Sequence, residues 1–284
     1  MEEIFVVGAG TMGRGIAHVA ALTGHRARLF DQDPAQVERA LAAMDAIMAG
    51  QVARGKLAET QRQAARDLVT PASTMAEGAQ GATFAVEAVI EKEGPKKEVL
   101  AELDGLLDPD AVIATNTSSI SITELAHATK RRDRVVGMHF FNPAQVMKLV
   151  EVVRGVETSD ATVSRARVLA DALGKTPIEV RIDSPGFVVN RILMPFLAEA
   201  VKVLEEGVAS RDDIDTAVKL GLNHPMGPLT LLDFTGVDVC TYVMDYFHQE
   251  FGDARYAPPQ TLRRLTRAGH HGRKTGKGFY DYGA

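Results

Sequence analysis

His139 and Glu151 are the two residues whose types and positions best suit proton transfer. Of the eight histidines, only His139 ends an apolar run that is typical of a buried strand, residues 135–138. Glu151 lies among apolar residues of the next expected strand, 148–153. A buried carboxylate is costly without a partner, so we expect Glu151 to bind one ring nitrogen while the other acts on a substrate. A histidine packed in the core is the alternative interpretation.

A glycine-rich turn follows the first apolar run of the chain. Residues 4–7 lead into Gly8-Ala9-Gly10-Thr11-Met12-Gly13, and a helical pattern begins directly behind them. Gly8 permits a tight turn, Gly10 lets N–H groups approach a phosphate, and Gly13 lets the helix pack close to the strand. A second expected strand ends at Asp31, where a carboxylate suits the hydroxyls of an adenosine ribose. The pattern predicts a site for NAD or a close relative, and a turn without a ligand is the alternative.

Charge favours NAD over NADP at this turn. Asp31 and Asp33 both face the expected ribose region, where they would repel a 2′-phosphate. Arg28 precedes Asp31 and is the cation that could turn toward the same region.

Polar residues follow the expected strand 112–115, where a carboxyl-end loop could contribute to a site. Asn116 and Ser118 belong to this loop, but Ser121 to Glu124 fit a capping box, so the loop could simply begin a helix. Asn190 lies on an apolar helix and is either a polar group that faces a cleft or a packed amide.

The elements that must position these residues alternate between strand and helix, which is typical of a parallel sheet covered on both faces. Strands are expected near 3–8, 27–31, 84–87, 112–115, 134–139, 148–153 and 177–182, with a weaker one near 68–70. Helices are expected near 12–24, 35–54, 59–67, 94–107 and 160–173. Two helices between consecutive strands predict a projecting helical hairpin, with Arg54 and Lys56 near its bend.

The pattern changes at Ser184-Pro185-Gly186. Beyond it, helices are expected at 187–207, 211–221, 227–250 and 259–269, and a strand at 279–282. We therefore predict an α/β fold with a Rossmann-type, doubly wound, mostly parallel sheet over residues 1–184. An all-helical C-terminal domain would follow over residues 185–284. A small substrate is expected in a cleft between them, near the carboxyl ends of the strands.

Composition excludes several classes of function. A net charge of −5 gives no electrostatic basis for binding nucleic acid or an anionic membrane surface. Cys240 is the only cysteine, which excludes an internal disulfide framework and a multi-cysteine metal site. No apolar run approaches the roughly 20 residues of a bilayer span. The first strand leaves no room for a leader peptide, so we expect a cytoplasmic protein. We also expect that the protein binds no metal.

Several segments together carry a family resemblance. They are Gly8–Gly13, Val86–Glu91, Ala114–Ser119, Gly137–Pro143, Met147–Glu151, Ser184–Arg191, Asn223–Pro228 and Gly276–Tyr282. Along nearly its whole length the chain resembles the 3-hydroxyacyl-CoA dehydrogenases, and among them the bacterial 3-hydroxybutyryl-CoA dehydrogenases. One departure is Gln145, where relatives often carry proline.

The resemblance implies NAD-dependent oxidation of a (3S)-3-hydroxyacyl-CoA, with His139 as general base and Glu151 as the partner that orients it. Ser118 and Asn190 would hold the reacting oxygen. Lys56 is similar to a lysine that meets the nucleotide end of coenzyme A, and Arg54 is the alternative. The implied cofactor contacts are Gly8, Gly10, Thr11, Met12, Gly13, Asp31, Glu91, Lys96 and Asn116.

The resemblance also implies an acyl-CoA as partner and a homodimer formed through the C-terminal domain. Two other functions are kept as alternatives. One is a dehydrogenase of another hydroxy acid, such as the related gulonate dehydrogenases, which would use the same histidine and glutamate. The other is a non-enzymatic structural protein that retains the fold.

Overall fold

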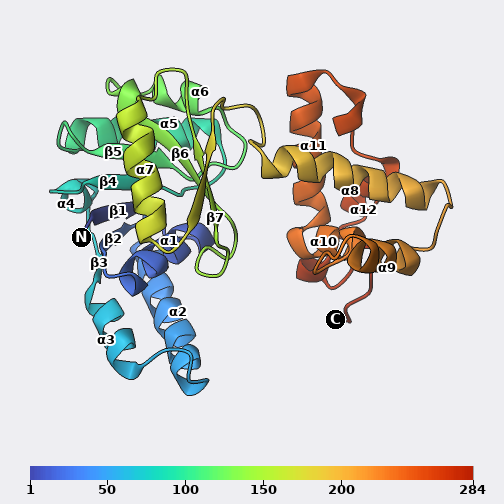
Figure 1. Cartoon of the computed structure of the whole chain (residues 1–284), viewed down its shortest axis with the longest axis horizontal. Coiled ribbons are helices and arrows are strands. Elements are labelled where there is room, and N and C mark those ends of the chain that lie inside the picture. Colours follow the sequence, from blue (N-terminus) through green and yellow to red (C-terminus); the bar gives the residue numbers. More distant parts are fainter. Residues whose placement is uncertain (284) are drawn as a thin grey trace. The chain divides into compact units, whose positions relative to one another are not determined.

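The computed structural model describes residues 1–283, which form two compact units. The first unit runs from Met1 to Phe187, and the second begins at Val188 (Figure 1). The segment Ser184-Pro185-Gly186 therefore belongs to the first unit. Within residues 1–283, no helix has the length and apolar character that crossing a membrane requires.

One eight-stranded sheet forms the centre of the first unit. Its strands are β1 (Glu3–Val7), β2 (Arg26–Phe30), β3 (Val69–Pro71), β4 (Phe84–Glu87), β5 (Val112–Thr115), β6 (Val135–Phe140), β7 (Leu149–Val153) and β8 (Thr176–Val180). They lie in the order β3-β2-β1-β4-β5-β6-β7-β8. Within this sheet β6 and β7 pair antiparallel, and the other neighbours pair parallel. The predicted doubly wound, mostly parallel sheet is confirmed.

Helices cover both faces of the sheet because successive strand residues are apolar on both sides. On β1, Val6 packs into one apolar cluster, whereas Phe5 and Val7 pack into the other. The helices of the first face are α1 (Thr11–Leu22), α2 (Pro34–Ala53), α3 (Glu59–Asp67) and α7 (Asp160–Ala172). Those of the second face are α4 (Met75–Ala79), α5 (Glu93–Leu106) and α6 (Ile122–Ala126) (Figure 1).

The helices α2 and α3 form the predicted hairpin, which projects from the sheet and is drawn in blue (α2) and cyan (α3) in Figure 1. Asp33 caps α2 by accepting a hydrogen bond from the Ala35 N–H at 3.1 Å. Between the two helices, Arg62 Nη2 lies 2.8 Å from Asp45 Oδ2. Arg54 and Lys56 lie in the bend, and both are exposed.

The second unit is helical. Its helices are α8 (Val189–Glu205), α9 (Arg211–Gly221), α10 (Pro228–Thr235), α11 (Val237–Phe251) and α12 (Gln260–Arg267). Short 3-10 helices also occur at η1 (Arg132–Arg134) in the first unit and at η2 (Ala254–Tyr256) and η3 (Arg273–Thr275) in the second. The single helix expected at 227–250 was wrong. Gly236, with φ of 110°, ends α10 and precedes α11, because this conformation is open to glycine but interrupts a helix.

The strand expected at 279–282 was also wrong. This segment makes only isolated bridges, in which Lys277 pairs with Gly272 and with Asp281. The buried Asp233 carboxylate accepts hydrogen bonds from the Phe279 and Tyr280 N–H groups, each at 2.8 Å. The Phe279 and Tyr280 N–H groups are therefore satisfied by a side chain instead of a neighbouring strand, and the Tyr282 N–H donates to the Gly276 carbonyl at 2.9 Å.

Candidate active site

His139 and Glu151 lie directly opposite each other on the antiparallel strands β6 and β7. His139 Nδ1 is 2.7 Å from Glu151 Oε2, and the two residues are 5% and 0% exposed. Opposite residues of an antiparallel pair have Cβ atoms roughly 5 Å apart, so the two short side chains can meet without strain. The structure thus brings together the two residues that the sequence analysis paired, and their catalytic roles stay a prediction.

Asn116 ties the end of the histidine strand to the loop that follows β5. Its Oδ1 accepts a hydrogen bond from the Phe140 N–H at 2.9 Å, and its own N–H donates to the Glu87 carbonyl at 2.8 Å. Phe140, the residue next to His139, is therefore held by a side chain from the loop that follows the neighbouring strand β5. Asn116 has this structural role whether or not it also touches a cofactor.

Ser118 and Thr117 bind the carboxylate of Glu91. Glu91 Oε1 accepts from Thr117 Oγ1 at 2.6 Å, from the Ser118 N–H at 2.7 Å and from Ser118 Oγ at 3.1 Å. Burial by itself would raise the pKa of Glu91, but the nearby Lys96 ammonium and these hydrogen bonds outweigh it and lower the pKa. Glu91 is therefore held as an anion beside Ser118, and the contact predicted between Ser118 and a substrate oxygen stays a prediction.

Lys96 connects Glu91 to a second, fully buried carboxylate. Lys96 Nζ lies 2.8 Å from Glu87 Oε1 and 3.1 Å from Glu91 Oε2, and the lysine is 1% exposed. Glu87 also accepts from Thr115 Oγ1 at 2.6 Å and from the Val89 N–H at 2.7 Å. Glu87 therefore has three polar partners in the core, although its place in the sequence gave it no predicted role.

The glycine-rich turn fits a dinucleotide. Gly8 has φ of 103°, and a Cβ on Gly13 would lie 1.7 Å from the Gly8 carbonyl oxygen, so both positions need glycine for the turn itself. A Cβ on Gly10 would meet nothing within 4 Å, which leaves the approach to the turn open. Thr11, Met12 and Gly13 form the first turn of α1, whose N–H groups lack partners within the helix and suit an anion.

Asp31 lies beside this turn, as predicted from its place after β2. Its Oδ2 accepts from the Ala9 N–H at 2.8 Å, and its Oδ1 accepts from the Asp33 N–H at 3.0 Å. Arg28 donates instead to the carbonyl oxygens of Glu77 and Gly78, at 3.0 and 3.2 Å. The cation that could have attracted a 2′-phosphate is therefore bound to α4, which favours NAD over NADP.

Three further predicted residues belong to other segments of the chain. Asn190 belongs to the second unit, where it is half-buried in the first turn of α8. Lys56 and Arg54 are in the bend of the helical hairpin. Contacts of these three residues with a substrate stay predictions.

The loop that joins β6 to β7 is held from two sides, by residues to which we assigned no role from the sequence. Lys175 is buried and donates from Nζ to the carbonyl oxygens of Ala144, at 2.6 Å, and Met147, at 2.9 Å. Burial lowers the pKa of Lys175. On the other side, a Cβ on Gly15 of α1 would lie 2.9 Å from Ala144 Cβ and 3.2 Å from Gln145 Oε1. A lysine directly after the glycine that ends α7 is the sequence signal for this contact.

Two aromatic rings flank His139, and these contacts were not predicted. The ring centroid of Phe141 is 4.5 Å from that of His139, and the centroid of Phe187 is 5.7 Å away in an edge-on arrangement. Phe187 is 3% exposed. Both residues belong to segments of the family resemblance, but spacing in the sequence gives no sign that they meet the histidine.

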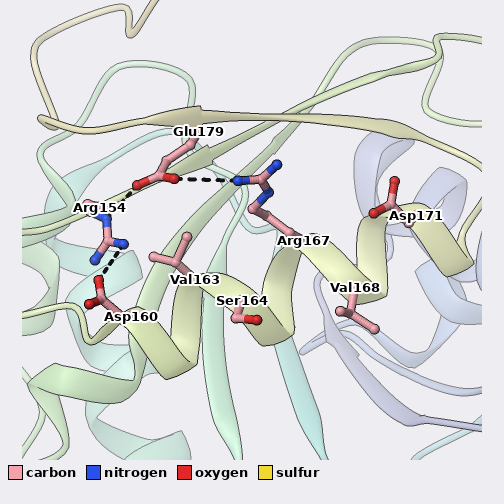
Figure 2. A pocket seen from close by; sticks show the side chains of 8 residues that line it. All are labelled: Arg154, Asp160, Val163, Ser164, Arg167, Val168, Asp171 and Glu179. Atoms are coloured by element: carbon pink, nitrogen blue, oxygen red, sulfur yellow. Dashed lines mark hydrogen bonds and ion pairs between the residues drawn. The ribbon is translucent and has the colours of Figure 1, made fainter.

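A separate pocket of about 330 Å³ lies beside α7, and four of its charged side chains, Arg154, Asp160, Arg167 and Glu179, form ion pairs (Figure 2). Arg154 contacts Asp160 at 2.7 Å and Glu179 at 2.8 Å, and Arg167 contacts Glu179 at 3.5 Å. β7 runs antiparallel to β6, so its end lies beside the start of β6. Arg154, which follows β7, therefore lies at the opposite end of the strands from His139.

Comparisons with known proteins agree along the whole chain. The family model of the 3-hydroxyacyl-CoA dehydrogenase NAD binding domain matches residues 3–183, and that of the C-terminal domain matches residues 186–282. The chain is 44% identical to a probable 3-hydroxybutyryl-CoA dehydrogenase of Bacillus subtilis, covering 99% of this chain and 98% of that protein. It is also 44% identical to a 3-hydroxybutyryl-CoA dehydrogenase of Clostridioides difficile, covering 99% of each.

Among solved structures, the chain is similar to (S)-3-hydroxybutyryl-CoA dehydrogenase from Ralstonia eutropha. The TM-score is 0.96 at 42% identity, and the match covers 100% of both chains.

Proposed function

The chain belongs to the 3-hydroxyacyl-CoA dehydrogenase family, and we propose that it catalyses the reversible, NAD-dependent oxidation of a (3S)-3-hydroxyacyl-CoA to the 3-oxoacyl-CoA. The short-chain 3-hydroxybutyryl-CoA is the proposed substrate, since the relatives carry its name. The observation that carries the proposal is the 2.7 Å contact between His139 Nδ1 and Glu151 Oε2. It lies at the end of β6, on the sheet edge that also carries the glycine-rich turn.

His139 acts as the general base in the oxidative direction. In the neutral imidazole, a carboxylate at Glu151 can only accept, so Nδ1 carries the proton of this contact and Nε2 has the lone pair. Nε2 then takes the proton of the C3 hydroxyl. The imidazolium that forms is stabilised by the buried Glu151 carboxylate, which also fixes the tautomer and the orientation of the ring. In the reductive direction the same imidazolium returns the proton to the oxygen.

NAD, when bound, supplies the acceptor for the hydride that leaves C3. The residues that would hold it are those of the glycine-rich turn, with Asp31 at the adenosine ribose. Glu91, Lys96 and Asn116 would line its nicotinamide half. The contact between Lys96 and Glu91, and the hydrogen bond from the Phe140 N–H to Asn116, support this by fixing the three polar side chains.

Ser118 and Asn190 are proposed to hold the substrate oxygen in line with His139. The Ser118 hydroxyl donates to Glu91 in this structure and would turn toward the substrate oxygen in the proposed role, which its half-buried position on the loop after β5 supports. Lys56, or Arg54 in its place, is proposed to meet the phosphates of coenzyme A, which is supported by the exposed cations at the hairpin bend.

We also propose a homodimer that forms through the second unit. Support comes from large apolar side chains that the second unit exposes, among them Ile192, Leu220, Phe234 and Tyr242. A cytoplasmic location is proposed as well, and a lone, buried cysteine is compatible with a reducing compartment.

The first test is the reductive reaction with acetoacetyl-CoA and NADH, followed by the loss of the nicotinamide absorbance of NADH. We expect turnover by the unaltered protein, and His139→Gln should lower kcat by about 100-fold or more because it removes the acid–base group. His127→Gln is the matched control, since His127 is exposed on the surface and should leave kcat unchanged.

Two results would contradict the proposal. Near-normal turnover by His139→Gln would remove the histidine from the mechanism. Turnover of a free hydroxy acid such as gulonate, with none of acetoacetyl-CoA, would move the function to the gulonate-type alternative.

A further inference from the structure

We propose that Phe187 is a positioning residue that holds the imidazole of His139 against Glu151, a role that rests on the function proposed above for His139. Phe187 is the last residue of the first unit, so it lies where the chain leaves the sheet domain. Its side chain is 3% exposed and packs in the apolar cluster of the second sheet face. A core residue of this kind need not touch the site, but this one does.

The first observation is the aromatic contact. The ring of Phe187 meets that of His139 edge-on, with a centroid distance of 5.7 Å and an interplanar angle of 61°. Phe141 contacts the same imidazole, with a centroid distance of 4.5 Å. The contact with Glu151 engages the imidazole at Nδ1, and the two flanking rings restrict rotation of the imidazole about that contact.

The second observation is the backbone of Phe187. Its φ is 52°, in the left-handed region that a bulky residue rarely adopts, and Gly186 before it has φ of 75°. The Phe187 N–H donates to the Ser184 carbonyl at 2.9 Å, which closes the turn. A glycine would adopt this conformation without strain, so the presence of phenylalanine indicates that its ring is needed at this position.

The third observation is how the start of this turn is anchored. Asp183 Oδ2 accepts from Ser121 Oγ and from the Thr123 N–H, each at 2.7 Å. Ser121 caps α6 and ends the loop that carries Ser118. The turn is therefore fixed at one end to the loop after β5 and at the other end to the histidine of β6. This double attachment holds Phe187 in a conformation that its own backbone disfavours.

The test compares Phe187→Ala with Phe187→Gly. Both variants remove the ring, but alanine keeps the left-handed strain and glycine relieves it, so glycine should be the more stable of the two in urea. If Phe187 positions His139, both should lower kcat by about 10-fold or more, while the Kd for NADH stays unchanged. Phe187→Leu keeps apolar volume and should recover part of kcat, and it remains available if the smaller variants do not fold.

Phe5→Leu is the matched control. Phe5 is fully buried in the same apolar cluster but has its aromatic contact with Phe30, so this variant should lose stability and keep its kcat. If Phe187 serves only the core, kcat will follow stability, and the glycine variant will be more active than the alanine variant. That result, or a kcat near the unaltered value in both, would overturn the proposal.

A second readout does not depend on turnover. The His139 Nδ1 proton, shared with Glu151, should give a low-field NMR signal that is protected from water, measured on protein with labelled histidine. We expect this signal to be lost in Phe187→Ala and retained in Phe5→Leu, and its survival in Phe187→Ala would also overturn the proposal. If the unaltered protein turns over no acyl-CoA, the proposed function fails, and this signal still decides the role of Phe187.

Discussion

His18 is a buried histidine of α1, and its titration should weaken the fold in mild acid. The residue is 1% exposed, and its Nε2 is a buried atom without a hydrogen-bond partner among residues 1–283. Burial, with a smaller contribution from the charge of Arg14, lowers the pKa of His18 from 6.5 to about 4. The folded protein therefore keeps this imidazole neutral at pH values where the unfolded chain protonates it.

The sign and size of the effect follow from proton linkage. Stability is fully present above pH 6.5, and it is lost as the pH falls toward 4, because the unfolded state binds the extra proton. The difference between the two pKa values corresponds to about 3 kcal/mol in total, and to about 2 kcal/mol near pH 5. A loss of this size is a large fraction of the roughly 5–15 kcal/mol by which domains are stable.

Urea unfolding, followed by circular dichroism at about pH 7.5 and about pH 5, measures this loss. His18→Leu has a similar volume and cannot titrate, so its free energy of unfolding should fall by about 2 kcal/mol less between the two pH values. His127→Gln removes an exposed histidine and should keep the response of the unaltered protein. An equal loss in His18→Leu and the unaltered protein would refute the reasoning.

Two further predictions concern the carboxyl ends of the strands, where NAD is proposed to bind. Gly10→Ala should fold normally, because its Cβ meets nothing within 4 Å, and should weaken NADH binding. Gly13→Ala should destabilise the fold, because its Cβ would lie 1.7 Å from the Gly8 oxygen. NADH titration and urea unfolding of both variants separate the two effects. Lys96→Met should cost about 3–5 kcal/mol of stability, since it leaves the buried Glu87 carboxylate without its cation. The double variant with Glu87→Gln should recover much of this loss in urea unfolding, and no recovery would contradict the account.

The sheet and its order of elements could be predicted from the sequence because they depend on local pattern. Continuous apolar runs such as β1 and β5 form strands buried on both faces, and the glycine-rich turn between β1 and α1 needs glycine at Gly8 and Gly13 for steric reasons. The contact of Glu151 with His139 was also accessible, since a carboxylate in an apolar strand requires a partner.

The features that were not predicted depend on residues far apart in the sequence or on unusual backbone. The segment 279–282 resembles a strand, but Asp233 accepts the hydrogen bonds of the Phe279 and Tyr280 N–H groups, and no local pattern shows a carboxylate that lies on α10. The left-handed Phe187 is invisible to propensity, which describes what a residue prefers and not what its surroundings impose. The contact of Lys175 with the β6–β7 loop was not predicted either, because it joins residues that are far apart in the sequence.

The reversal of strand direction at β6–β7 is what makes the histidine and the glutamate a pair. Because β7 starts at the edge where β6 ends, Glu151 near its beginning lies opposite His139 near the end of β6. A parallel β7 would bring a different part of the strand to that edge. A slip of one residue would turn the Glu151 side chain to the other face, away from the imidazole. The register that pairs His139 with Glu151 is therefore the feature on which the proposed proton transfer depends.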